Sequence, residues 1–157
     1  NQDRFAGAIF SGGAFRLAEN PSSLLRWVVE ALAVILPLTG VMKIDGRKIS
    51  RDADVVEAYL QDPLVHHKSY SARLISEFIQ ATENLRENAR AIFIPVLALH
   101  GEADTLTAPE GSPDFIENIS SQDKTLKMLS GVYHEILNEP EGYQVMSDIK
   151  LWIDERI

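Results

Sequence analysis

The 157-residue sequence contains no cysteine, which excludes disulfide scaffolds, thiolate metal sites and cysteine nucleophiles. It also lacks a basic excess: 15 lysines and arginines stand against 23 acidic residues, for a formal net charge of -8. Phosphate binding needs a basic face, so no nucleic-acid partner is expected. The longest apolar run, Ala31 to Leu36, is too short to span a bilayer.

The absence of cysteine fits a reducing compartment. No signal peptide is visible, and the sequence opens at Asn1 without a methionine, so we expect its natural start to lie upstream. The expected location is cytoplasmic or peripheral to a membrane.

The residues that are present are those of an ordinary globular protein, with 45% apolar and 24% charged residues. Apolar runs predict strands at Phe5–Phe10, Ile92–Leu99 and Thr125–Leu129. Between the first two, Asn20-Pro21 predicts the start of a helix that runs to Leu36, and Asp52 predicts the cap of a second helix. Helical patterns also follow Ser69 or Ser71, Ser112 and Asn138. The order is a strand, a largely helical insertion, then helix–strand–helix–strand–helix, which indicates an α/β fold with a parallel sheet.

An acid and a histidine follow the last two predicted strands. Asp104 comes after Leu99-His-Gly-Glu-Ala, and His134 comes after Leu129-Ser-Gly-Val-Tyr. Chemistry in such sheets sits at the carboxyl ends of the strands. Neighbouring strands lie about 5 Å apart, so we expect the two side chains to meet in a hydrogen bond. A serine hydrolase needs such a pair, and the order acid then histidine is that of α/β-hydrolases.

Several segments carry a resemblance to a known family. Ile94-Pro-Val-Leu-Ala-Leu-His-Gly-Glu-Ala-Asp104 resembles the acid strand and loop of α/β-hydrolases. Gly131-Val-Tyr-His134, Asp62-Pro-Leu-Val65 and Ser121-Gln-Asp-Lys-Thr-Leu-Lys127 are similar, more narrowly, to monoacylglycerol lipases and lysophospholipase-like relatives. The resemblance implies the C-terminal part of an α/β-hydrolase fold: residues 1–13 as a core strand, 14–68 as a helical cap or lid, and 69–157 as the C-terminal part of the core.

The family resemblance also implies roles for residues. Asp104 and His134 would be members of a catalytic triad, Tyr59 would lie near the glycerol head group, and Leu106 would lie near the acyl chain. No cofactor and no metal are expected. The Gly-x-Ser-x-Gly nucleophile elbow occurs nowhere in this sequence, and the family places it, with the oxyanion hole, upstream of Asp3-Arg-Phe.

The expected function is a serine-type hydrolase of monoacylglycerols or lysophospholipids whose nucleophile lies in a missing N-terminal part. The 157-residue chain alone should then be inactive. Expected partners are a lipid ester, the missing half of the fold, further copies in an oligomer, and a membrane surface touched transiently through the cap. The alternatives are another α/β-hydrolase chemistry, such as peptidase or epoxide hydrolase, and a non-catalytic binding or interaction module. An elbow serine in the upstream coding sequence would favour the enzyme.

Other histidines and apolar residues have plainer interpretations. His100 is expected to be structural, at the end of its strand. His66-His67 suggests a metal site, but adjacent histidines diverge and no third ligand is evident, so a solvated loop is the better interpretation. The helix from Leu24 to Leu36 is either ordinary core or a lipid-facing cap, and its density of apolar residues favours the cap.

Overall fold

A computed structural model describes residues 2–18 and 21–157. A three-stranded parallel sheet forms its core, in the order β1 (Ala8–Ser11), β4 (Val96–Gly101) and β5 (Lys124–Leu129). Every residue of β4 is buried, as a central parallel strand requires when helices cover both faces of the sheet. The α/β fold with a parallel sheet, predicted from the sequence, is confirmed.

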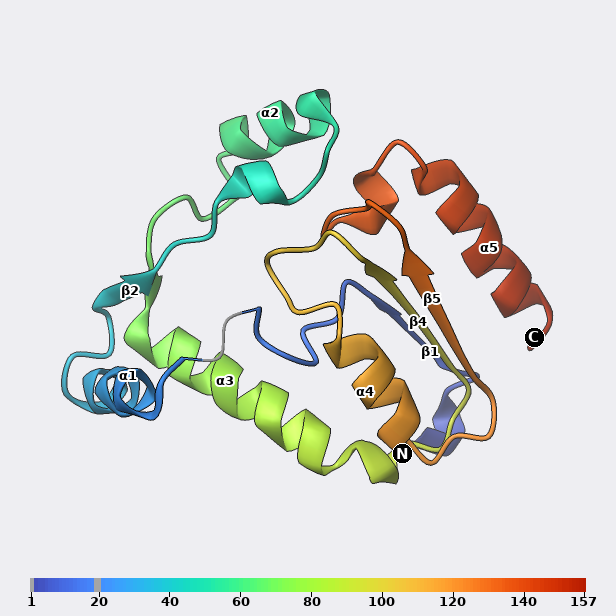
Figure 1. Cartoon of the computed structure of the whole chain (residues 1–157), viewed down its shortest axis with the longest axis horizontal. Coiled ribbons are helices and arrows are strands. Elements are labelled where there is room, and N and C mark those ends of the chain that lie inside the picture. The colour runs from blue at the N-terminus through green and yellow to red at the C-terminus, as the bar shows by residue number, and fades with distance from the viewer. Residues whose placement is uncertain (1, 19–20) are drawn as a thin grey trace.

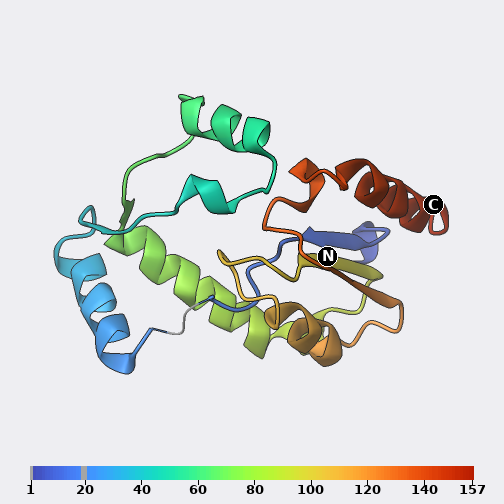
Figure 2. The ribbon, with the colours of Figure 1, turned by 45° about the horizontal axis from the view of Figure 1, so that its top comes forward.

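Side-chain alternation along β4 divides the core into two layers. Leu97 and Leu99 point to one face and pack with Val145 and Trp152 of α5 (Gly142–Asp154). Val96 points to the opposite face, where α4 (Gly111–Asn118) covers it. Figure 2 shows the sheet between α5 on one side and α4 with the end of α3 on the other.

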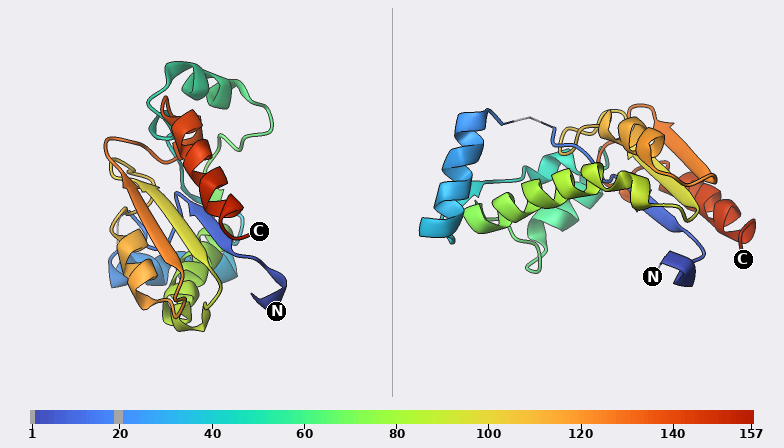
Figure 3. Two further views of the ribbon diagram at one scale, coloured as in Figure 1. Left: turned by 90° about the vertical axis from the view of Figure 1, so that its right-hand side faces the viewer. Right: turned by 90° about the horizontal axis from the view of Figure 1, so that it is seen from below.

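The remaining helices extend away from the sheet. α3 (Ala72–Glu87) begins beside α1 (Ser23–Ile35) and runs towards the sheet (Figures 1 and 3). Val29 of α1 packs on Ile75 and Ile79 of α3. Arg26 of α1 makes a two-pronged ion pair with Glu83 of α3, at 2.6 and 2.9 Å. α2 (Ala53–Gln61) lies near the loop that follows β5 (Figure 1).

Short elements complete the fold. A small antiparallel pair joins β2 (Gly40–Met42) to β3 (Tyr70–Ser71), just before α3. The 3-10 helices are Gln2–Arg4, Gly46–Lys48, Ala89–Ala91 and Ile136–Asn138. Within residues 2–18 and 21–157, no helix combines the length and the apolar character needed to cross a bilayer.

Several predicted boundaries were wrong. The helix predicted from Asn20-Pro21 begins at Ser23, because the side chain of Ser22 accepts the N–H of Leu25 as its cap; Asn20 itself lies outside the described residues. The first strand begins at Ala8, because the chain leading to it turns through a 3-10 helix and leaves Phe5 63% exposed. The insertion also contains one strand, β2, where only helices and loop were expected.

Candidate active site

Asp104 and His134 meet in space as the sequence predicted. Asp104 follows β4 in a turn closed by its own N–H donating to the carbonyl oxygen of Gly101, at 3.1 Å. His134 follows β5 after a turn at Gly131, where φ is +72°. Nδ1 of His134 lies 2.7 Å from Oδ2 of Asp104. The Asp104 side chain is fully buried, whereas 29% of the His134 side chain is exposed.

Donors surround the Asp104 carboxylate on both oxygens. Oδ1 accepts the backbone N–H groups of Leu106 at 2.7 Å and Thr107 at 3.1 Å. Oδ2 faces the Thr107 hydroxyl at 2.8 Å and Nε2 of His100 at 3.1 Å, besides His134. Burial alone would raise the pKa of Asp104, but hydrogen bonds from His100, His134, Leu106 and Thr107 outweigh it and hold the pKa well below its usual range. The carboxylate is therefore ionised at neutral pH.

His100 holds Asp104 from behind. Its side chain is fully buried, and Nδ1 lies 2.6 Å from the Ser112 hydroxyl at the start of α4. Asp104 accepts from Nε2, so that nitrogen carries a proton, while Nδ1 is bonded to the Ser112 hydroxyl. This contact agrees with the structural role expected for His100.

Two glycines let the loops approach each other. A Cβ on Gly101 would stand 2.2 Å from the carbonyl oxygen of Val132 and 2.3 Å from that of Tyr133. Gly12 has φ +58°, and a Cβ there would stand 2.7 Å from the carbonyl oxygen of His134. Sequence reasoning missed the contact of Gly12 with His134, as it missed Ser112 and Thr107.

The surroundings of His134 shift its pKa and fix which ring nitrogen carries the proton. The hydrogen bond to Asp104 raises its pKa, burial opposes this, and the charges of Asp104 and Glu135 add to the increase. Because Asp104 accepts from Nδ1–H, the neutral ring has its lone pair on Nε2. Among the described residues, none forms a hydrogen bond with Nε2. The ring can therefore take a proton from a group that approaches Nε2.

The other two predicted site residues lie at different distances from this pair. Leu106 is in the same loop as Asp104, to which its N–H is bonded. Tyr59 belongs to α2, where its ring lies against Gly46 and edge-on to His67, with ring centroids 6.1 Å apart. Burial raises the pKa of Tyr59, and the charges of Tyr70 and Glu135 add to it. The effect of Glu135 places Tyr59 near the histidine loop, which comprises residues 130–135 between β5 and the 3-10 helix Ile136–Asn138.

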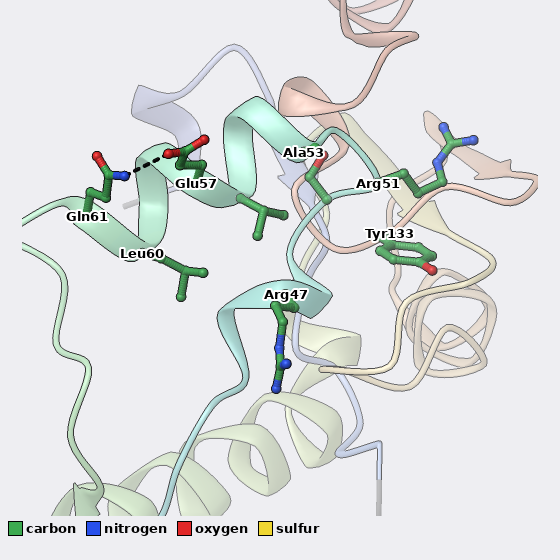
Figure 4. A pocket seen from close by; sticks show the side chains of 9 residues that line it. Arg47, Arg51, Ala53, Glu57, Leu60, Gln61 and Tyr133 are labelled. Atoms are coloured by element: carbon green, nitrogen blue, oxygen red, sulfur yellow. Dashed lines mark hydrogen bonds between the residues drawn. The ribbon is translucent and has the colours of Figure 1, made fainter.

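A cavity of about 590 Å³ opens between α2 and the histidine loop. Its lining includes Ser50, Arg51, Val56, Leu60 and Tyr133. Figure 4 shows Leu60 and Gln61 at one side of this cavity, and Arg51 and Tyr133 at the other.

His66 and His67 hydrogen-bond to backbone carbonyls of their own loop, those of Ser69 and Asp62. In the part of the chain that the structure describes, no group of three or more histidine, aspartate or glutamate side chains is placed to hold a metal ion.

A parallel sheet with an acid loop and a histidine loop leaving the carboxyl ends of two adjacent strands defines the α/β-hydrolase class. The present chain corresponds to the C-terminal part of that fold. Residues 1–141 match the family described as serine aminopeptidase, S33, and the chain belongs to this family. The predicted likeness to its monoacylglycerol lipase members is also confirmed.

Relatives of known identity point the same way. A monoacylglycerol lipase of Mycolicibacterium smegmatis is 34% identical over 149 residues, which are 95% of this chain and 53% of that protein. The crystal structure of Paleococcus ferrophilus monoacylglycerol lipase superimposes with a TM-score of 0.89 at 31% identity, covering 99% of this chain and 61% of that one. A soluble variant of the Saccharomyces cerevisiae monoglyceride lipase, in complex with a substrate analog, gives 0.83 at 28% identity, with 99% and 55% covered. The chain spans about half the length of the curated relatives it matches.

Proposed function

We propose that this chain supplies the acid and the histidine of a serine hydrolase that cleaves carboxylic esters. The observation that carries the proposal is the 2.7 Å contact between Nδ1 of His134 and Oδ2 of a fully buried Asp104. His134 would take the proton of a serine hydroxyl as that oxygen attacks the ester carbonyl, and would then return it to the leaving alcohol. Asp104 would fix the tautomer and stabilise the imidazolium.

The serine belongs to a segment outside these 157 residues, because no Gly-x-Ser-x-Gly elbow occurs within them. We propose that this segment packs along the outer edge of β1. β1 is an end strand of the sheet, and Ile9 on it is 37% exposed. An exposed strand edge of this kind favours pairing with further strands.

The substrate would be a monoacylglycerol or a lysophospholipid. The named relatives are monoacylglycerol and monoglyceride lipases, and this supports an ester with one long acyl chain. In this proposal residues 14–68 form a cap over the site, residues 1–13 and 69–157 belong to the core, Leu106 lies near the acyl chain, and Tyr59 lies near the head group.

The cap would also touch lipid surfaces transiently. α1 carries large apolar side chains that are more than half exposed, namely Leu24, Leu25, Trp27, Val34 and Ile35. Exposed apolar side chains gathered on one helix favour contact with another apolar phase. Trp27 fluorescence should shift to the blue when vesicles of neutral lipid are added, and an unchanged spectrum together with no co-sedimentation would contradict the contact.

The ester hydrolase is tested by labelling the protein that carries this chain, together with its upstream segment, with a fluorophosphonate. We expect one serine adduct, mapped by mass spectrometry outside residues 1–157, and no labelling in His134→Ala. Monoacylglycerol and lysophospholipid turnover are then compared at saturation. An adduct on Ser11 or on any other serine of this chain would refute the proposed location of the nucleophile.

Peptide-bond cleavage is the second candidate, and the description of the family as serine aminopeptidase favours it. The same acid and histidine serve both reactions. An aminoacyl nitroanilide tested beside a nitrophenyl ester separates them. Faster turnover of the nitroanilide would replace the lipase assignment.

A further inference from the structure

Glu139 is a buried carboxylate that the proposed reaction does not use. It follows the 3-10 helix Ile136–Asn138, and none of its side chain is exposed. Its Oε1 accepts two backbone N–H groups, that of Tyr133 at 3.1 Å and that of Arg51 at 3.0 Å. Its Oε2 accepts Nε–H of Arg51 at 2.6 Å. One carboxylate therefore joins the residue before His134 to the segment that leads into α2.

The residue on the other side of His134 is tied to the same segment. The N–H of Glu135 donates to the carbonyl oxygen of Ile49 at 2.8 Å. The Ser50 hydroxyl donates to the carbonyl oxygen of Asn138 at 3.0 Å. Ile49 and Ser50 are each only 2% exposed, so these bonds are shielded from water. Both neighbours of His134 are thus held by contacts that depend on residues 49–51.

The Arg51–Glu139 ion pair has a fully buried carboxylate, whereas the nearby Arg47–Asp45 pair is exposed. Removing Arg51 would leave the buried charge of Glu139 uncompensated, which proteins tolerate poorly. Arg51 also pairs with Glu141 at the start of α5. Arg47, by contrast, pairs with Asp45 within its own segment, and its side chain is 76% exposed. Figure 4 shows Arg51 beside Tyr133, whereas Arg47 extends in another direction.

We propose that Arg51 and Glu139 are positioning residues. Through them, the packing of residues 49–61 against the histidine loop determines the orientation of His134. The inference rests on the proposed function in one respect, that His134 is the base. When residues 49–61 move away from the histidine loop, Glu139 loses the positive charge of Arg51, and Glu135 loses its hydrogen bond to Ile49. The imidazole then leaves its alignment with Asp104, and small displacements of a reacting group are costly to the rate.

The test follows the His134 Nδ1–H proton by NMR, because a proton in a charge-assisted hydrogen bond resonates at low field and needs no turnover to be seen. Its assignment comes from its loss in His134→Gln. We compare Arg51→Ala, Arg51→Lys and Glu139→Gln, with Arg47→Ala as the matched control. Amide exchange at Tyr133 and Glu135 is measured in the same samples.

We expect Arg51→Ala to broaden or abolish the His134 resonance and to speed exchange at Tyr133 and Glu135. In the protein that carries this chain together with its upstream segment, Arg51→Ala should lower kcat about 10- to 100-fold, with a smaller change in KM. Arg51→Lys should recover part of both effects, since it keeps the charge, and Arg47→Ala should show neither. A folded Arg51→Ala with an unchanged resonance and kcat would overturn the inference, as would an equal effect of Arg47→Ala.

Glu139→Gln keeps the inference testable if Arg51→Ala does not fold. Its carbonyl oxygen still accepts the N–H of Tyr133, but its amide group meets Nε–H of Arg51 donor to donor. We expect faster exchange at the amides of Arg51 and Glu135, which donate to Glu139 and to Ile49, and a weakened His134 resonance. Fast exchange there with an intact resonance would refute the coupling. Absence of the resonance from the unaltered protein would instead count against the proposed function.

Discussion

Asp104→Asn should abolish catalysis while leaving the fold nearly intact. The amide oxygen can replace Oδ1 and keep the N–H groups of Leu106 and Thr107. The NH2 group then stands where Oδ2 faced Thr107, His100 and His134. Its two hydrogens can serve the Thr107 oxygen and Nδ1 of His134. His100 can change tautomer, accept the Thr107 O–H at Nε2 over 3.3 Å, and donate from Nδ1 to Ser112. No buried group need lose its partner.

His134 is the residue that cannot adapt without loss. To accept from the new NH2 group, its Nδ1 must be unprotonated, so the proton moves to Nε2, which can then no longer take one from a serine. A comparable change of tautomer in other serine hydrolases costs about 10⁴-fold in kcat, which corresponds to about 5.4 kcal/mol of transition-state stabilisation. Loss of the carboxylate charge should also lower the pKa of His134.

The assay is ester turnover by the protein with its nucleophile, together with urea unfolding and nitrogen NMR of the imidazole. Asp123→Asn is the matched control, because Asp123 pairs with Arg156 away from the site. We expect the control to keep its kcat. A kcat of Asp104→Asn within tenfold of the unaltered protein, with the fold intact, would refute the reasoning.

Three further predictions follow from the same geometry. The pKa of His134 is raised above 6.5, the ordinary value for histidine, and the protonated ring cannot act as a base. The acidic limb of kcat/KM should therefore have its midpoint above pH 6.5. A midpoint at or below 6.5 in a pH–rate profile would contradict this. The 157-residue chain alone should hydrolyse neither a nitrophenyl ester nor a monoacylglycerol, and turnover that His134→Ala abolishes would mean that a nucleophile lies within it. Gly101→Ala should cost about 3 kcal/mol or more in urea unfolding, the upper range for overpacking, because its Cβ would overlap the carbonyl oxygens of Val132 and Tyr133. Gly131→Ala, with open space but φ +72°, should cost only about 1–2 kcal/mol, and an equal loss in both variants would exclude the overlap as the cause.

The pH dependence of stability should follow the same pair. The folded-state pKa of Asp104 is depressed, so its contribution is present above the ordinary value of 3.8 and is lost as pH falls towards the folded pKa. The folded-state pKa of His134 is raised, so its contribution is complete below 6.5 and is lost as pH rises through the folded pKa.

The sequence predicted the central strand and the Asp104–His134 contact, because a local apolar pattern could be combined with a general rule about parallel sheets. The apolar run before Gly101 predicted the central strand, although that strand begins only at Val96, after Pro95. The carboxyl-end rule then brought Asp104 and His134 together without any knowledge of their contacts. β2 was missed because Gly40-Val-Met42 is too short to show alternation, and its pairing with Tyr70–Ser71 is decided by how α1 folds back on α3.

The support around the pair was beyond sequence reasoning for a physical reason. Gly12 contacts His134, Ser112 is bonded to His100, and Glu139 is bonded to Arg51. Each partner lies 12 or more residues away along the chain, so no spacing within one segment reveals the contact. Glycine, serine and glutamate are also common in exposed loops, so the residue type alone does not mark these three positions. What distinguishes them is burial and the closeness of backbone atoms, properties that exist only once the strands are paired. The chemistry-bearing residues of such a site are therefore readable from the sequence, whereas the residues that hold them in place become visible only in the folded chain.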